Sequence, residues 1–246
     1  MLPIRPLRAL LAVAFLIVLL VGIDASATAL ASTRHAQWLT GTLLTAGLIA
    51  LHGAFAPVLL AWLTNAQPLD DQLRTATTEL RAHVGALGTT MQVQFFIVDR
   101  QTPSALSVGV GPTSTVFVSR GLMAMDAPTV RFALAHELAH LQAGHPILLS
   151  AFFAALYATK TLMELPPIAI LLALLGYLAV LRQAELQADR GAARWLGTSA
   201  AKQALHALAA ALGETRPPAR WITLLSTHPS FAQRCSALNM ERKKNP

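Results

Sequence analysis

Long apolar runs dominate the pattern of hydrophobic and polar positions along this chain. Residues 9–23 are apolar without interruption, and residues 38–63 contain no Asp, Glu, Lys or Arg. Each run is long enough to cross a hydrocarbon core of about 30 Å as a helix. The pattern therefore predicts two transmembrane helices within residues 1–66.

A third apolar block covers residues 146–181 and is interrupted by Lys160, Glu164 and the pair Pro166 and Pro167. Proline lacks an amide hydrogen and clashes with the preceding helical turn, so a helix ends or bends there. The block therefore predicts a helical hairpin that turns at the prolines and either spans or re-enters the membrane. The alternative is a buried helical pair inside a soluble core.

The remaining stretches, residues 67–145 and 182–246, are more polar and predict one folded domain built from two parts of the chain. Residues 68–88 have apolar side chains at helical spacing, which predicts an amphipathic helix leading from the membrane. The β-branched and aromatic content of 91–98 and 115–119 predicts two strands.

A further helix should follow the second strand. Asp126 and Pro128 form a typical helix start, and the apolar spacing that follows extends to Gly144. This helix contains the most informative residues of the chain.

The composition supports a membrane protein. Hydrophobic residues make up 54% of the 246 positions and charged residues 13%, and the mean hydropathy is +0.51. Soluble domains are less apolar and more highly charged. The first run could instead be a signal peptide, because Ala25, Ser26 and Ala27 resemble a cleavage site. Its length and the second run close behind it favour a retained helix.

The net charge of +7 raises the question of nucleic acid binding. Basic residues are dispersed, apart from Arg242, Lys243 and Lys244, and no nucleic-acid motif is present. We therefore expect no nucleic acid partner, and the positive charge suits the anionic cytoplasmic leaflet of a membrane. The single cysteine, Cys235, excludes both an intrachain disulfide and a zinc site made of cysteines.

Basic residues also predict the orientation of the chain. Arg5 and Arg8 precede the first span, whereas the following loop carries Arg34 as its one Lys or Arg. Positive charge favours the cytoplasmic side, so we expect residues 67–145 to be cytoplasmic after two spans. A hairpin at 146–181 would return the rest of the chain to that same side, in a multi-pass protein of the cell membrane.

The sequence His136-Glu137-Leu138-Ala139-His140 is an H-E-x-x-H motif within the predicted helix. Positions i and i+4 lie on the same helix face, so both imidazoles can bind one metal ion while Glu137 flanks the metal-bound water. Two neutral imidazoles, an open position for water and a carboxylate base are the requirements of zinc hydrolysis. A chance match of the pattern is the alternative.

A catalytic zinc site needs a third protein ligand. Arg182, Glu185 and Asp189 lie at i, i+3 and i+7, which places them on one face of a helix. We interpret Glu185 as the third ligand. Asp189 could accept a hydrogen bond from the outer ring nitrogen of a zinc-bound histidine. Without the upstream motif, the same three residues would suggest a solvated charged face.

Two further features bear on substrate. An extended substrate can add to a strand near the metal helix, and either Val116, Phe117 and Val118 or the segment 104–109 could serve. The alternative is that these segments are ordinary core strands of the sheet. His228 lies in a turn before a terminal helix, where it could donate a hydrogen bond to an oxyanion or simply begin the helix.

Taken in order, these motifs resemble the HtpX-type membrane zinc metallopeptidases, gluzincins related to the CAAX prenyl protease. The matching residues are H-E-L-A-H at 136–140, His145, E-L-Q-A-D at 185–189, T-H-P-S at 227–230 and Arg234.

The resemblance implies one zinc ion per chain, held by His136, His140 and Glu185. Glu137 would be the general base, and His228 would stabilise the transition state with electrostatic support from Arg234. Asp189 would hold a ligand in place. The implied fold is a mainly α membrane protein with about four transmembrane or hairpin helices. To these it adds an α+β, zincin-like catalytic domain with a small β-sheet.

The chain departs from the family pattern at two positions. Family members often have an Asn-Ala-Phe-Ala sequence before the metal helix, where this chain has Ser104-Ala105-Leu106-Ser107. The glycine that the family usually has within H-E-x-G-H is Ala139. The first change affects substrate binding, whereas the second replaces one small residue by another.

The predicted function is a zinc endopeptidase of the cytoplasmic membrane face that cleaves unfolded or damaged membrane proteins. The main alternative is a sensor or scaffold that retains a zinc site without catalysis, although such a protein would not need Glu137. An intramembrane protease of the site-2 type is disfavoured because Arg131, Gln142 and His145 suit lipid poorly. A prenyl-peptide protease is disfavoured because its relatives have more spans.

Overall fold

The structure is a computed structural model of the 246-residue chain. It describes residues 43, 46–47, 55–68, 74–75, 78, 92–109, 111–148, 151–152, 155–156, 159, 166–214 and 226–242. The predicted helix at 9–23, most of 38–63 and most of the amphipathic segment 68–88 lie outside the described residues.

The described strands form one mixed sheet in the order β1-β2-β4-β3. These strands are β1 (Gln67–Pro68), β2 (Gln94–Val98), β3 (Ala105–Val108) and β4 (Thr115–Ser119). β2 and β4 are parallel, and the other two pairs are antiparallel. The two strands that the sequence predicts are thus confirmed as the central pair, and β3 is an edge strand beside them.

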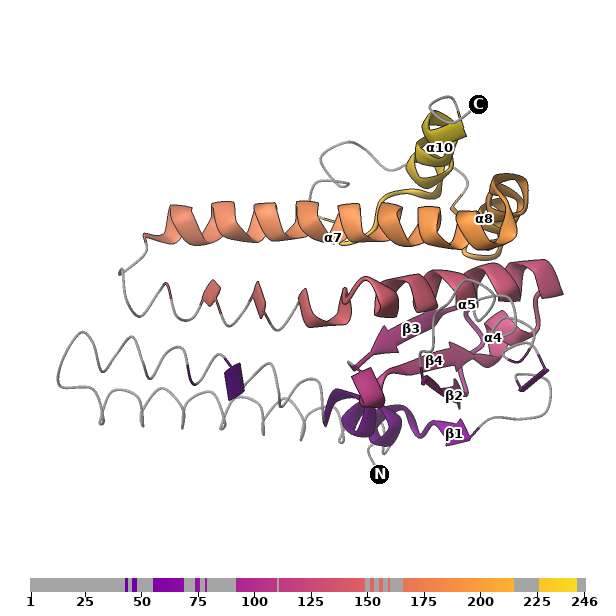
Figure 1. Cartoon of the computed structure of the whole chain (residues 1–246), viewed down its shortest axis with the longest axis horizontal. Coiled ribbons are helices and arrows are strands. Elements are labelled where there is room, and N and C mark those ends of the chain that lie inside the picture. The colour runs from indigo at the N-terminus through magenta and orange to yellow at the C-terminus, as the bar shows by residue number, and fades with distance from the viewer. Residues whose placement is uncertain are drawn as a thin grey trace.

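The helices lie in layers against this sheet. They are α4 (Arg120–Met123), α5 (Ala127–Gln142), α7 (Pro167–Leu196), α8 (Thr198–Ala211) and α10 (Phe231–Arg242), with a short 3-10 helix at Gly111–Thr113. α5 lies between the sheet and the layer that contains α7 and α8 (Figure 1). The mostly helical fold with a small sheet agrees with the predicted fold class.

Helix α5 begins where the sequence predicts. Asp126 is its N-cap, and the fixed φ angle of Pro128 suits the first helical turn. Just before it, the Ser119 hydroxyl accepts hydrogen bonds from the amides of Leu122 (3.0 Å) and Ser104 (2.9 Å). Ser119 therefore caps α4 and fastens the start of β3 to the end of β4.

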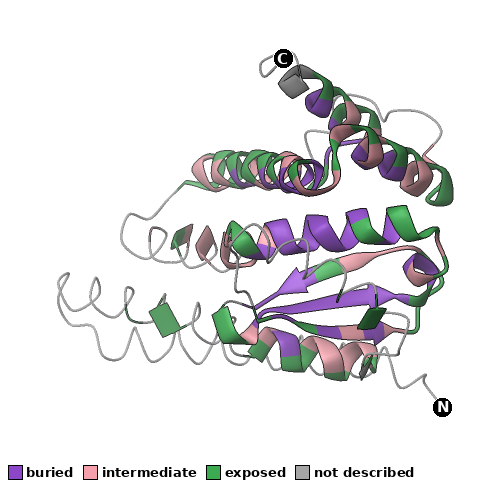
Figure 2. Ribbon diagram, turned by 45° about the vertical axis from the view of Figure 1, so that its right-hand side comes forward, coloured by how far each residue is buried: buried purple, intermediate pink, exposed green. Residues whose placement is uncertain are grey.

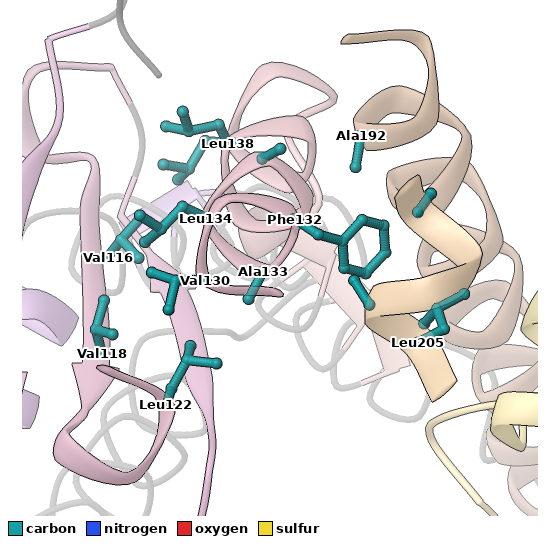
Figure 3. Close-up of a cluster of buried hydrophobic side chains, with 14 of the residues drawn as sticks. Val116, Val118, Leu122, Val130, Phe132, Ala133, Leu134, Leu138, Ala192 and Leu205 are labelled. Atoms are coloured by element: carbon teal, nitrogen blue, oxygen red, sulfur yellow. The ribbon is translucent and has the colours of Figure 1, made fainter. Parts of the chain in front are cut away.

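Helix α5 is buried on two opposite sides. On one side, Val130 and Leu134 pack toward the β4 residue Val116, and on the other Phe132 points toward Ala192 and Leu205 (Figure 3). Phe132, Leu134 and Leu205 are each at most 1% exposed. The motif helix is therefore the central element of the core rather than an amphipathic surface helix.

Helix α7 has two contrasting halves. Large apolar side chains are exposed over its first half, namely Ile168, Leu171, Leu172, Leu174 and Val180. Buried residues occupy its second half, where the helix packs on α5 (Figure 2). Within the described part of the chain, α7 is the one helix that is long and apolar enough to cross a membrane, and 11% of its apolar window is buried. A core helix of a soluble protein would be mostly buried.

Helix α7 begins at the prolines where the sequence predicts the turn of a hairpin, and the hairpin itself stays a prediction. Pro166 is the N-cap of the helix, and Pro167 is its first residue. The Phe152 and Tyr177 rings stack at 4.1 Å between centroids, so Phe152 lies beside α7. The predicted division at residue 182 falls inside the continuous helix, which joins the apolar half directly to the candidate site. A count of four spans remains a prediction.

Candidate metal centre

The three predicted ligands converge between α5 and α7. His136 and His140 project from one face of α5, and Glu185 comes from the buried half of α7. One donor atom from each of these three residues lies within 4.8 Å of the other two. Residues that are up to 49 positions apart in the sequence therefore form one group that could hold a metal ion.

The separations between the two imidazole nitrogens and the two oxygens of Glu185 are short. The two Nε2 atoms of His136 and His140 are 3.0 Å apart. Glu185 Oε2 lies 3.5 Å from His136 Nε2, and Glu185 Oε1 lies 3.2 Å from His140 Nε2. The side chains are 8 to 12% exposed, so the donors face inward. A single cation among them would contact all three.

The outer nitrogen of His136 is held by a buried ion pair. His136 Nδ1 donates to Asp189 Oδ1 at 2.9 Å. Arg234 binds both oxygens of that carboxylate, with Nε at 2.8 Å from Oδ2 and Nη2 at 2.6 Å from Oδ1. Asp189 is 1% exposed, so water does not reach its carboxylate. The guanidinium of Arg234 supplies the hydrogen bonds and the positive charge that stabilise this buried negative charge.

This environment favours positive charge at the His136 ring. Burial by itself lowers the pKa of His136, but hydrogen bonds with Asp189 and Glu185 outweigh it and raise the pKa to about 9. Two buried carboxylates thus stabilise a cation at this point. A bound metal ion would meet the same electrostatic requirement.

The outer nitrogen of His140 has a different partner. His140 Nδ1 lies 2.8 Å from Nδ1 of His145, and the two rings meet edge to face with centroids 4.8 Å apart. Sequence reasoning gave His145 no role. The signal that could have found it is Gly144, since a glycine after a helix end reverses the chain onto the last turn.

His228 reaches the same group from the loop before α10. Its Nδ1 lies 3.1 Å from Glu185 Oε2, while the side chain is 68% exposed. This contact is the main cause of the raised pKa of His228, and burial opposes it. The loop is fastened to α7, because Arg182 donates to the Ser226 carbonyl at 3.0 Å. The Ser226 hydroxyl in turn donates to the His228 carbonyl at 2.7 Å.

Glu137 is adjacent to this group on α5 and is 8% exposed. Burial lowers the pKa of Arg234, but the hydrogen bond and charge of Asp189 outweigh it, and the charges of Glu185 and Glu137 raise that pKa further. The role of general base that the sequence predicts for Glu137 stays a prediction at this point.

The structure separates the two segments considered for substrate. Val116, Phe117 and Val118 belong to β4, which is paired on both sides by β2 and β3 and is at most 3% exposed at these residues. Strand addition requires a free edge, so these three residues do not fit the predicted role. The alternative segment, 104–109, contains β3 at the edge of the sheet, where Leu106 is 48% exposed.

Comparison with known proteins gives a consistent picture. Residues 69–242 match the family described as peptidase family M48. A solved structure with a similar fold is the crystal structure of S. mikatae Ste24p, with a TM-score of 0.66 and 15% sequence identity. The similarity covers 96% of this chain and 65% of that chain, so this protein spans less than two thirds of its length. No curated protein matches.

Proposed function

The chain belongs to peptidase family M48, and from this premise we propose that it is a membrane-bound, zinc-dependent endopeptidase. The observation that carries the proposal is the convergence of His136, His140 and Glu185 beside a buried Glu137. This donor set is that of the gluzincin sites with which the sequence motifs agree.

The donor geometry fits zinc. A tetrahedral zinc ion with bonds of about 2.0–2.1 Å separates neighbouring ligand atoms by about 3.3 Å. Here the two imidazole nitrogens are 3.0 Å apart, and each has a different oxygen of Glu185 within 3.2 or 3.5 Å. One donor from each residue lies within 4.8 Å of the other two, so small shifts of the side chains would bring the group to this spacing. His136, His140 and Glu185 would hold one ion per chain. When bound, zinc would polarise the scissile carbonyl and lower the pKa of a water molecule in its open position to about 7.

The protein groups around it have separate tasks. Glu137 accepts the proton of the attacking water and passes it to the leaving amine. In its imidazolium form, which the Glu185 contact favours by raising the pKa of His228, His228 donates Nδ1–H to Glu185 and still has an Nε2–H that can donate to the oxygen of the scissile carbonyl as negative charge develops there. Asp189 and Arg234 hold the His136 ring in one orientation, so the ligand does not have to reorganise during the reaction.

The edge strand β3 is the proposed binding site for the substrate main chain. It pairs with β4 on one side, and the register joins Leu106 to Phe117. An extended peptide on the other side would gain main-chain hydrogen bonds that do not depend on its sequence. Such binding suits unfolded polypeptides, which expose their backbone, better than folded ones.

Helix α7 supports membrane proteins as the substrate class. Its last strongly exposed apolar residue is Val180, and Glu185 follows five positions later. At 1.5 Å per residue, Glu185 lies about 7.5 Å further along the helix axis. If the apolar half lies in the bilayer, the reaction takes place close to the membrane surface. We therefore propose cleavage of unfolded or damaged membrane proteins at the cytoplasmic face.

The experiment that tests the function uses the full chain purified in detergent, with zinc content measured before each assay. Casein degradation is compared for wild type and Glu137→Gln, with zinc present or removed by a chelator. His206→Gln is the matched control, because His206 is an exposed residue of α8 outside the metal group.

We expect cleavage by wild type and by the control, and loss of cleavage in Glu137→Gln with zinc still bound. A wild type that holds one zinc but cleaves neither casein nor an unfolded membrane protein would contradict the peptidase. That result would favour the sensor or scaffold.

A further inference from the structure

His145 lies where it can control the orientation of a metal ligand. Helix α5 ends at Gln142, and Gly144 follows with a left-handed φ of +71°. The Gly144 amide donates to the Leu141 carbonyl at 3.1 Å, and the His145 amide donates to the His140 carbonyl at 3.0 Å. This pair of bonds is a Schellman motif, which returns the chain onto the last helical turn.

The same turn brings the two side chains together. In a Schellman motif, the residue after the left-handed glycine contacts the residue five positions earlier, usually through apolar groups. Here both of these residues are histidines, and their Nδ1 atoms are 2.8 Å apart. His145 is thus bound to His140 twice, once through its backbone and once through its ring.

The proton positions in this pair follow from the chemistry of a metal ligand. The Nε2 of His140 faces His136 and Glu185, and a nitrogen that binds a metal must present its lone pair. The proton of His140 therefore lies on Nδ1. A hydrogen bond between two Nδ1 atoms contains one proton, so Nδ1 of His145 must accept the proton of His140. The single proton of a neutral His145 is then on Nε2. The side chain of Gln187, on α7, is a further hydrogen-bond partner of His145.

We propose that His145 is a positioning residue that accepts the Nδ1–H of His140 and so directs the Nε2 lone pair of His140 at the metal. The inference rests on the proposed zinc site. The two histidine ligands are then held unequally: His136 by the carboxylate of Asp189, and His140 by a neutral imidazole. The hydrogen bond between His145 and Gln187, in which the imidazole donates, also connects this imidazole to the helix that supplies Glu185.

The test measures metal binding and does not depend on proteolysis. Zinc affinity is measured by competition with a chromophoric chelator for the full chain in detergent, for wild type, His145→Ala and His145→Asn. The Asn side chain can place its carbonyl oxygen near the position of the lost Nδ1 and restore the acceptor. His206→Ala controls for the loss of a histidine elsewhere. The melting temperature of each zinc-free protein reports any purely structural effect.

We expect His145→Ala to bind zinc about 10- to 100-fold more weakly, the usual effect of removing the partner of a metal-bound histidine. His145→Asn should recover most of the affinity, and His206→Ala should match wild type. The visible spectrum of the cobalt-substituted protein should change in His145→Ala and return toward wild type in His145→Asn.

Three results would overturn the inference. One is a zinc affinity of His145→Ala within about twofold of wild type. Another is an equal loss in His145→Ala and His145→Asn, which would mean that ring packing and not hydrogen bonding matters. The third is a wild type that binds no zinc, which would overturn the proposed function as well. Zinc binding with the expected ranking but without proteolysis would leave the inference standing and contradict the function alone.

Discussion

Gly191 on α7 lies against Ala139 of the motif helix so closely that a Cβ added at Gly191 would be 2.7 Å from the Ala139 Cβ. The family usually has glycine at the position of Ala139, so this chain has one methyl group at the crossing, supplied by α5. Contact at such short range brings α7 close enough for Glu185 to reach the two histidines. The crossing of these helices therefore sets the spacing of the three residues that could hold a metal ion.

This contact predicts a compensating pair of substitutions. Gly191→Ala should destabilise the protein by about 1–3 kcal/mol through overpacking, although alanine in a helix would otherwise gain about 1 kcal/mol. It should also weaken zinc binding, because the helices must separate. Adding Ala139→Gly moves the methyl group to the other helix and should restore both properties. Thermal unfolding and zinc affinity of the two single variants and the double variant are the measurements.

The opposite outcome has a clear meaning. If Gly191→Ala alone raises the melting temperature, helix propensity outweighs packing at this position. Helices α5 and α7 could then move apart at this crossing without a loss of stability.

The ion pair of Asp189 and Arg234 predicts that removing the arginine alone costs more stability than removing both charges. Arg234→Met leaves a carboxylate that is 1% exposed without the guanidinium that binds both of its oxygens, and should cost about 3–5 kcal/mol. The double variant Asp189→Asn/Arg234→Met should be more stable than Arg234→Met, because a neutral amide can still accept from His136. Denaturant unfolding in a double-mutant cycle measures the coupling, and Arg234→Lys tests whether the two-pronged contact matters. A coupling energy near zero would show that the pair contributes little.

His228 should be needed for rate but not for metal binding. It is 68% exposed and contacts the group through Glu185, so His228→Ala should leave the fold and zinc content close to those of wild type. Loss of one hydrogen-bond donor to the oxyanion lowers kcat by about 10²–10³. Steady-state kinetics with a fluorogenic peptide, with zinc quantified in the same sample, separates the two effects. A change in KM alone would assign His228 to ground-state binding instead.

The edge strand predicts a difference between neighbouring positions. In an antiparallel pair, every second residue exchanges backbone hydrogen bonds with the neighbouring strand. The Ser119 amide donates to the Ser104 carbonyl, so Leu106, two residues after Ser104, also bonds to β4. The amide of Ser107 then points away from β4. Ser107→Pro should therefore weaken substrate binding and raise KM, whereas Leu106→Pro should break a bond within the sheet and lower the melting temperature.

Peptide kinetics and thermal unfolding of both proline variants test this prediction. An unchanged KM in a folded Ser107→Pro protein would count against strand addition at β3.

Much of the site could be predicted from local spacing. His136 and His140 are one helical turn apart, as are Glu185 and Asp189, and a regular helix places each pair on one face whatever surrounds it. The start of α5 at Asp126 is also a local property. These predictions required only the helix period and the chemistry of the side chains.

Other features depend on contacts between distant parts of the chain. The sequence marks residues 115–119 as a strand but does not reveal its neighbours, and the structure places β4 between two strands, away from an open edge. Strand order depends on pairing between segments, which no local pattern specifies. The predicted substrate contact at Val116, Phe117 and Val118 failed to fit for this reason.

The sequence by itself determined which residues could bind a metal, because the type of each side chain and its spacing along a helix follow directly from the order of the residues. The tertiary structure decided that Glu185 reaches His136 and His140, and that Asp189 meets Arg234 across 45 positions. It also decided which partner each histidine has, Asp189 for His136 and His145 for His140. These relationships depend on how closely α5 and α7 pack and on where the chain turns back at Gly144, and packing distance is a property of two surfaces in contact.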